Sequence, residues 1–432
     1  MTQIGIGLAG LGNVGTGVYK HLALNRVLLR ERLGIELTIR KVAVRDLAKK
    51  RDVEVPPALL TTDPFTLIDD PSIQIVVELI GGIDTAHRFV LAAIAAGKMV
   101  VTGNKALLAE HGREIFAAAA EKKVPIFYEA AVAGGIPIIK AIREAFVGNH
   151  ILSIHGIING TSNYILTRMV EQGLDFPEAL AEAQSLGYAE ADPTLDVNGW
   201  DAAHKAIILA SLAYGFWVES DKIFVEGVEN ITAADIAFSA NLGYTIKLLG
   251  IIKADPDQRV EVRVHPTLIP KSHVLASVGG VFNAIAVRGD VVGDTLFYGR
   301  GAGQDPTTSS VISDLAEAAQ ALQAPRSSFG FTAHSLYAAV KPIEEVVSSF
   351  YLRLQVEDRP GVLAQVAGIL GNHEIGISSM IQPEVPCGSD SVPLVLMIHL
   401  AVEGRMRLAL AQIADLAVVK APPALLRVET FS

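Results

Sequence analysis

Residues 3–15 read QIGIGLAGLGNVG and decide the fold of the first part of the chain. Residues 3–9 form an apolar run that predicts a strand, and the turn Gly10-x-Gly12-x-x-Gly15 follows it and opens a helix. In that setting the glycines make a tight turn, let the backbone approach a pyrophosphate and let the helix pack on the strand. The helix N-terminus attracts phosphates. The pattern predicts a dinucleotide site, with contacts at Gly10, Gly12, Asn13, Val14 and Gly15.

Strand and helix patterns alternate through the next hundred residues. Strands are expected at 37–44, 75–80, 99–102 and 124–128, and helices at 88–96 and 110–123. This alternation is typical of parallel βαβ units and a doubly wound sheet. We therefore expect an α/β fold, in which residues 1–130 form a Rossmann-type NAD(P)-binding domain.

The residues that follow the second strand bear on the choice of cofactor. An acidic residue there binds a ribose 2′-hydroxyl, whereas Arg accommodates a 2′-phosphate. Arg45 ends the strand, Asp46 is next, and Lys49, Lys50 and Arg51 follow. Arg45 favours NADP(H), while Asp46 leaves NAD(H) open. A solvated basic segment without a ligand is the alternative.

Two further regions follow the first domain. Residues 131–307 mix helical patterns with short strands and predict an α+β domain, in which 235–250 are expected to form a helix. A helix is expected at 308–322, in a segment of about 308–340 that returns to the first domain. Residues 349–432 have βαββαβ order, which predicts a small ferredoxin-like sandwich.

Composition excludes several classes of protein. Half of the 432 residues are hydrophobic and the net charge is -10, which argues against a nucleic-acid binder. The single cysteine, Cys387, allows neither an intrachain disulfide nor a cysteine zinc site. The N-terminus has no basic region typical of a signal peptide, and apolar stretches are too short to span a membrane. We expect a soluble, cytoplasmic protein.

An unusually acidic stretch lies at residues 187–205. Glu190 and Asp201 can hold an ammonium group, and Lys205 lies four residues after Asp201 on an expected helix. A lysine near acids can donate a proton to a developing alkoxide. The alternative is a surface salt bridge between Asp201 and Lys205, worth a few tenths of a kcal/mol.

The run from Ala183 to Lys205 resembles the signature of the homoserine dehydrogenase family. Motifs similar to that family's also lie at Gly160-Thr161-Ser162-Asn163-Tyr164, Thr102-x-Asn104-Lys105 and Gly299-Arg300-Gly301-Ala302-Gly303. They fall in the family's order and span essentially the whole chain. The sequence departs from the family pattern at Arg300, where proline is usual, and at Asp305, where an apolar residue is usual.

The resemblance implies reversible reduction of L-aspartate 4-semialdehyde to L-homoserine with NAD(P)H. By carry-over, Lys205 is the proton donor and Lys105 is a second lysine near cofactor and substrate. Glu190 and Asp201 bind the amino acid. The remaining pocket residues are expected to be Asp196, Tyr188, Gly160 and Thr161, and further cofactor contacts are expected at Thr102, Gly187 and Gly303. Residues 131–307 then form the substrate-binding, catalytic and dimerisation domain.

The segment 129–136, EAAVAGGI, follows an expected strand. From the sequence alone it is a glycine-rich hinge between domains. The resemblance implies a structural sodium site, formed by the Glu129 carboxylate and the carbonyls of Val132, Gly134 and Ile136. Oxygen ligands suit a hard cation.

Residues 352–382 resemble an ACT domain, a small module that senses amino acids. Asp358-Arg359-Pro360-Gly361 is its turn into a helix, whose N-terminus can take an amino acid's carboxylate. The resemblance implies threonine as effector and pairing across subunits, in a homodimer or homotetramer. A degenerate module that only dimerises is the alternative.

The rival functions fall into two classes, other dehydrogenases and a non-enzymatic amino-acid sensor. A phosphorylating semialdehyde dehydrogenase needs a nucleophilic cysteine, and Cys387 lies in the tail. Another ACT-bearing hydroxyacid dehydrogenase would use Arg, Glu and His as catalytic residues. A weak or non-enzymatic amino-acid sensor predicts damaged catalytic positions, yet Lys105, Glu190, Asp201 and Lys205 are all present.

Overall fold

The computed structural model describes residues 2–324, 330–383 and 390–431, and Cys387 lies outside them. The chain forms two compact units. The first unit contains Met1–Ile154, His204–Asp221 and Asn283–Ala338, and the second contains His155–Ala203, Lys222–Phe282 and Ala339–Ser432. Across the described residues, the helices are too short or too polar to cross a membrane.

The first unit contains a six-stranded parallel sheet with the order β3-β2-β1-β4-β5-β6. Its strands are β1 (Thr2–Ala9), β2 (Ile35–Ala43), β3 (Leu60–Thr61), β4 (Ile75–Glu78), β5 (Met99–Thr102) and β6 (Ile126–Phe127). The strand order reverses between β1 and β4. The carboxyl ends of these two strands therefore form a switch point, where sheets of this kind bind ligands. The expected α/β, Rossmann-type sheet is confirmed.

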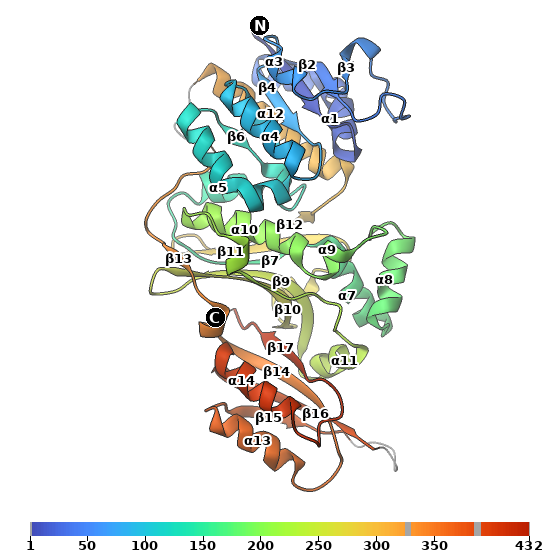
Figure 1. Ribbon diagram of the computed structural model, residues 1–432, viewed down its shortest axis with the longest axis vertical. Coiled ribbons are helices and arrows are strands. Elements are labelled where there is room, and N and C mark those ends of the chain that lie inside the picture. Colours follow the sequence, from blue (N-terminus) through green and yellow to red (C-terminus); the bar gives the residue numbers. More distant parts are fainter. Residues whose placement is uncertain (1, 325–329, 384–389, 432) are drawn as a thin grey trace. The chain divides into compact units, whose positions relative to one another are not determined.

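Helices cover this sheet, and one of them comes from much later in the chain. The helices are α1 (Asn13–Leu24), α2 (Arg26–Leu33), α3 (Thr66–Asp69), α4 (Asp84–Ala95), α5 (Lys105–Lys122) and α12 (Gln304–Gln323). Figure 1 shows α12, in light orange, among the blue helices. A Cβ on Gly17 of α1 would lie 2.2 Å from the Thr308 hydroxyl of α12, so glycine permits the close packing of these two helices.

The remaining elements of the first unit are short turns and helices after β6, and two strands from later in the chain. They include a 3₁₀ turn (Glu129–Ala131), α6 (Ile138–Lys140), a π-helical turn (Ala141–Ala145), β11 (Phe282–Gly289) and β12 (Gly293–Arg300). Helix α10 (Trp200–Tyr214) begins in the second unit and continues in the first.

The second unit is built on a mixed sheet. Its path runs β9-β10-β17-β14-β16-β15, and β8 and β13 also pair with β10. The strands are β8 (Phe224–Val225), β9 (Tyr244–Ala254), β10 (Arg259–Pro270), β13 (Ala339–Val340), β14 (Val347–Val356), β15 (Ile377–Ile381), β16 (Val392–Val402) and β17 (Ala424–Val428), with β7 (Ile151–Ile157) preceding them in the chain. The helices are α7 (Gly160–Gln172), α8 (Phe176–Ser185), α9 (Thr194–Val197), α11 (Ala233–Asn241), α13 (Val362–Asn372) and α14 (Glu403–Ala414).

One helix expected from the sequence is wrong over most of its length. Residues 235–250 were expected to be helical, but α11 ends at Asn241 and β9 begins at Tyr244. Gly243 has a φ of +86°, which ends the helix and turns the chain. Residues 246–250 are buried in the sheet, and a continuous apolar run does not distinguish a buried strand from a buried helix.

The tail has the expected order of elements. Strand β14, α13, β15, β16, α14 and β17 follow one another, with the sheet order β17-β14-β16-β15. Alternate residues of β14 and β16, among them Leu352 and Leu394, pack in one core with residues of the two helices such as Val366 of α13. This is the ferredoxin-like arrangement.

Candidate active site

The glycine turn joins β1 to α1 through backbone contacts that exclude side chains. Gly10 has a φ of +105°, and a Cβ there would lie 2.2 Å from the carbonyl oxygen of Leu79. A Cβ on Gly15 would lie 2.1 Å from the Gly10 carbonyl oxygen. Around Gly12, by contrast, a Cβ would meet no described atom within 4 Å. Gly10 and Gly15 therefore serve packing, and Gly12 leaves open space for a ligand.

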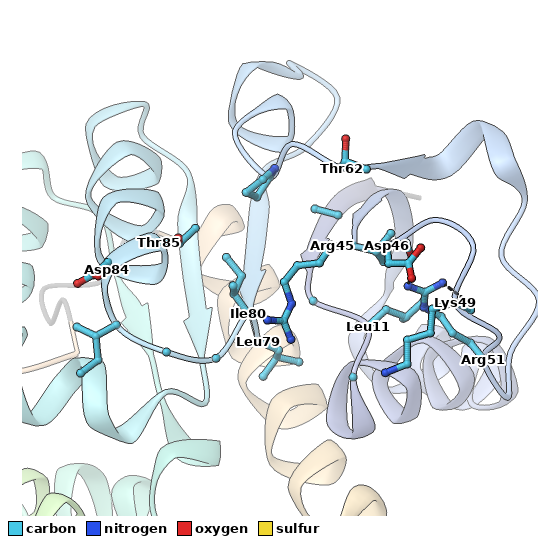
Figure 2. Close-up of a pocket in the computed structure, with 18 residues that line it drawn as sticks. Leu11, Arg45, Asp46, Lys49, Arg51, Thr62, Leu79, Ile80, Asp84 and Thr85 are labelled. Atoms are coloured by element: carbon cyan, nitrogen blue, oxygen red, sulfur yellow. Dashed lines mark hydrogen bonds between the residues drawn. The ribbon is translucent and has the colours of Figure 1, made fainter.

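A cleft of about 680 Å³ opens beside this turn. It is lined by Gly10 and Gly12, by Arg45 after β2, and by residues 79–85 between β4 and α4 (Figure 2). These segments follow the carboxyl ends of neighbouring strands on both sides of the switch point, where ligands bind in such sheets. The volume falls in the range of small-molecule sites.

Charged residues after β2 line one side of the cleft. In Figure 2 the Arg45 side chain extends toward Leu79, with Asp46, Lys49 and Arg51 gathered beside it. Arg51 donates to the carbonyls of Asp46 and Lys49, at 2.6 and 2.8 Å, so it braces its own loop. Asp46 accepts from the Ala48 N–H at 2.8 Å in a local turn. Arg45 and Lys49 are therefore the cations best placed to meet an anion.

The N-termini of α1 and α12 lie side by side. Gln304, next to Gly303, donates to the backbone carbonyl and the side-chain oxygen of Asn13, at 3.0 and 3.1 Å. Gly303 has a φ of 121°, a conformation that favours glycine, and Val14 packs on the core below the turn. Gly303 and Asn13, both expected to contact the cofactor, are thus neighbours in one unit.

The two departures from the family pattern have local partners. Asp305 lies in the first turn of α12, and its carboxylate is 3.1 Å from the Nε2 of His21. An acidic residue in that turn is favourable because of the helix dipole. Arg300 uses its carbonyl, which accepts from the Gly135 N–H at 3.1 Å.

A buried carboxylate supports the residues that precede Lys105. Glu78, at the end of β4, accepts from the Thr102 hydroxyl at 2.6 Å and from the Ile80 N–H at 2.8 Å. Burial raises its pKa. The Thr102 hydroxyl in turn accepts from the N–H of Asn104, which caps α5. Lys105, half-buried, is the first residue of that helix.

In the second unit, Asn159 joins the expected substrate residues. Its amide nitrogen donates to Asp196 at 2.7 Å and to Asp201 at 2.8 Å. Its oxygen caps α7, which begins at Gly160, by accepting from the Ser162 N–H at 2.7 Å. Two carboxylates held by one amide create a place that attracts a cation such as an ammonium group.

Four other residues expected at the substrate or cofactor lie close in sequence to Asn159 or Asp196. They are Thr161, Gly187, Tyr188 and Glu190. The Thr161 hydroxyl donates to the Tyr188 carbonyl at 2.9 Å. The Glu190 carbonyl accepts from the Gln184 side chain, while the Glu190 side chain is exposed. Gly187 ends the α8 segment with a φ of 74°. The structure thus joins Thr161 to Tyr188, and Asp196 to Asp201.

Lys205 and Asp201 lie one turn apart on α10, and both are buried. Asp201 belongs to the second unit, and Lys205 belongs to the first together with Lys105. The burial of both side chains argues against the alternative of a surface salt bridge between them.

The Glu129 carboxylate is buried between backbone donors. Its two oxygens accept from the N–H groups of Ile139 and Lys140, at 2.8 and 2.9 Å. Burial raises its pKa. The Gly134 carbonyl accepts from the Ser310 hydroxyl at 2.6 Å. Each of these oxygens keeps a lone pair for a further ligand.

The loop after Glu129 turns its carbonyls by means of unusual backbone angles. Ala133 and Gly134 have φ of 53° and 45°, the left-handed region. Such a conformation in a residue other than glycine costs free energy and needs support from its surroundings. Val132 and Ile136, on either side, are buried.

Sequence reasoning missed two residues that organise these groups. Asn159 directly precedes the Gly160 motif, and the only local signal was its suitability as a helix cap. Glu78 is the acidic end of a buried strand, which is itself unusual. Their side-chain partners lie between 24 and 42 residues away in the chain.

Family comparisons match both parts of this arrangement. The model described as "Homoserine dehydrogenase, NAD binding domain" matches residues 10–129, and the model "Homoserine dehydrogenase" matches residues 137–316. Residues 317–432 lie beyond both matches.

Similar proteins match the chain over its whole length. It is 47% identical to a homoserine dehydrogenase of Pseudomonas aeruginosa, over 100% of both chains, and 44% identical to that of Synechocystis, over 98% and 99%. A crystal structure of a homoserine dehydrogenase from Thiobacillus denitrificans superposes with a TM-score of 0.93 at 44% identity, covering 100% and 99% of the chains. The sensor and hydroxyacid dehydrogenase alternatives are not favoured.

The glycine cleft, the motifs and these similarities agree, and the chain therefore belongs to the homoserine dehydrogenase family of NAD(P)-dependent oxidoreductases.

Proposed function

We propose that the residues joined above carry out the reversible reduction of L-aspartate 4-semialdehyde to L-homoserine. The observation that carries the assignment of roles is Lys205, buried on α10 one turn after Asp201, which Asn159 holds beside Asp196. Residues of this kind, in a family of this activity, suit an amino-acid substrate with a reducible aldehyde.

In this proposal the bound nicotinamide supplies hydride chemistry, and the chain supplies binding and a proton. Glu190 and Asp201 bind the substrate's ammonium group, with Asp196, Tyr188, Gly160 and Thr161 around it. As hydride reaches the aldehyde carbon, the Lys205 ammonium gives a proton to the oxygen, which becomes the hydroxyl of homoserine. Lys105 stabilises negative charge near the cofactor. Thr102, Gly187 and Gly303 are proposed as further cofactor contacts.

The first prediction concerns Lys205. Lys205→Ala should lower kcat for homoserine oxidation by about 10²- to 10⁴-fold, the usual contribution of a positioned general acid–base group. NADPH affinity, measured by quenching of intrinsic fluorescence, should change little, because Lys205 does not line the dinucleotide cleft. An Ala variant with undiminished kcat would exclude Lys205 as the proton donor.

We also propose that NADP(H) is preferred, with NAD(H) as a weaker cofactor. Arg45 and Lys49 line the cleft, while Arg51 is bound to its own loop and Asp46 is bound to Ala48. A 2′-phosphate would therefore meet two cations. A solved archaeal homoserine dehydrogenase described as a complex with NADPH is 27% identical to this chain, with a TM-score of 0.63 over 75% of it.

The second prediction tests this preference. Removing a charged hydrogen bond costs about 1.5–3 kcal/mol, or roughly 10- to 100-fold. Arg45→Ala should therefore lower kcat/KM for NADP⁺ by that factor and change kcat/KM for NAD⁺ only slightly. Lys50→Ala is the matched control, because Lys50 is an exposed cation of the same loop that does not line the cleft. Equal losses with both cofactors would contradict the role of Arg45.

The segment around Glu129 is proposed to hold a structural sodium ion. The ligands would be the Glu129 carboxylate and the carbonyls of Val132, Gly134 and Ile136. Burial raises the pKa of Glu129 and holds that of Asp314, which accepts from the Glu129 N–H, well above its ordinary value. A cation on these oxygens would offset the cost of burying the charged carboxylate.

The third prediction follows from the sign of these shifts. A carboxyl whose pKa is raised by folding stabilises the protein at low pH, and that stability is lost as the pH rises through the folded pKa. Sodium should therefore raise Tm more at pH 8 than at pH 5, where protons compete with it for the carboxylates. Thermal unfolding in NaCl and in choline chloride of equal ionic strength measures this. A Tm that is independent of the cation at both values would rule out the site.

For residues 349–432 we propose an ACT-type module that binds threonine, and pairing of subunits as a homodimer or homotetramer. The family matches end at residue 316, which is compatible with a separate module in the tail. Gly361 has a φ of 90° and caps α13, whose N-terminus would take the ligand's carboxylate. Asp358, exposed in the same turn, would take its ammonium group.

We also propose domain limits at 130/131 and at 307/308, which separate the NAD(P)-binding domain and its returning segment from the substrate-binding domain.

The fourth prediction is that threonine inhibits homoserine oxidation. Asp358→Ala should weaken inhibition about 5- to 150-fold in threonine concentration, the usual range of such coupling, without changing the uninhibited rate. Asp415→Ala provides the control, because Asp415 is an exposed acid at the end of α14. An enzyme indifferent to threonine would leave only the subunit-pairing role.

A further inference from the structure

Two histidines and a glutamate meet on adjacent helices of the first unit. His87 lies on α4, and His111 and Glu114 lie on α5. The Nε2 of His87 is 2.9 Å from the Oε2 of Glu114, and the two imidazole rings stack with their centroids 4.1 Å apart. One ligand atom from each residue lies within 4.8 Å of the other two. The cluster is separate from the cleft and from the Glu129 segment.

We propose that this cluster binds one zinc-class divalent cation that bridges α4 and α5. Imidazole nitrogen and carboxylate oxygen are the donors that zinc takes in three-residue sites, with a further position open to water. His111 and Glu114 are three residues apart, so they project from one face of α5. His87 faces them from the neighbouring helix.

The distances are compatible with a small rearrangement of side chains. Two ligands of a tetrahedral zinc ion, each about 2.0–2.1 Å from it, lie roughly 3.4 Å apart. The separation of His87 and Glu114 is already close to that value. The stacked rings are only 19° from parallel, whereas a metal lies in the plane of each imidazole that binds it. One ring must therefore turn, which its partial exposure permits.

A surface ion pair is the simpler account of part of this cluster. It explains the contact between His87 and Glu114, and such pairs contribute about 0–1 kcal/mol. It does not account for His111, which places a second imidazole against the same pair. A cation would use all three side chains at once.

The position of the cluster gives such an ion a structural consequence. Helix α4 begins at Asp84, which lines the dinucleotide cleft, and α5 begins at Lys105. A metal that joins the two helices would restrain both of these N-termini. It would therefore stabilise the first unit and hold the cleft's edge in place.

The fifth prediction is tested by calorimetric titration of the full chain, freed of metals by a chelator, with ZnCl₂. We expect one zinc ion per chain and a rise in Tm on binding. His111→Ala and His87→Ala should each weaken binding at least tenfold, and MgCl₂ at the same concentration should not bind at this site. His21→Ala is the matched control, because His21 also pairs with a carboxylate, that of Asp305. It should bind zinc as the unaltered chain does.

Three results would overturn the proposal. The first is the absence of stoichiometric zinc binding by the unaltered chain. The second is unchanged affinity in either histidine variant, and the third concerns Glu114. Glu114→Gln, at a side chain that is 58% exposed, guards against misfolding as the cause of a loss. It should keep the fold by circular dichroism and weaken zinc binding; if it binds zinc fully, Glu114 is not a ligand and the three-residue site is wrong.

Discussion

The close approach of three backbone segments at the glycine turn is the constraint on which the first unit depends. Gly10 lies against the carbonyl of Leu79, and Gly15 lies against the carbonyl of Gly10. Backbone atoms cannot move aside as side chains do, so these contacts fix α1 against β1 and β4. At Gly17 the absence of a side chain lets the side chains of Gln304 and Thr308 on α12 pack closely against α1. A helix from the far end of the catalytic region is thereby held beside the turn.

The N-termini of α1 and α5 have no acidic side chain of the chain itself to balance their partial positive charge. Helix N-termini carry partial positive charge and usually attract acidic residues, with effects of about 0.3–1 kcal/mol. Yet α1 and α5 have no acidic residue in their first turns, and α5 even begins with Lys105. Departures from local rules of this kind are expected at functional sites. Phosphates of a dinucleotide bound beside Gly12 would satisfy the N-terminus of α1.

The parts of the fold that the sequence predicted are those governed by local pattern. Strand 99–102 was placed at its observed limits, because its apolar run is short and bounded by turn residues. Residues 244–250 were misassigned, because burial on both faces removes the alternation that marks a strand. Asn159 and Glu78 escaped notice, because their roles come from hydrogen bonds to residues distant in sequence. The remaining site residues were predicted from the resemblance to family motifs, because hydrophobic periodicity does not distinguish a catalytic polar residue from an ordinary surface residue.

The last strand ties the tail to the rest of the second unit. Strand β17 pairs with β14 inside the ferredoxin-like sheet and also with β10, where Thr267 faces Arg427. Arg427 is buried and pairs with Glu403 of α14 and with Glu226. Removing one partner from a buried pair costs about 3–5 kcal/mol, so the strand resists slipping in register. Strand β17 therefore links the sheet of the tail to β10 by backbone pairing, and a shift of β17 would move β10 with it.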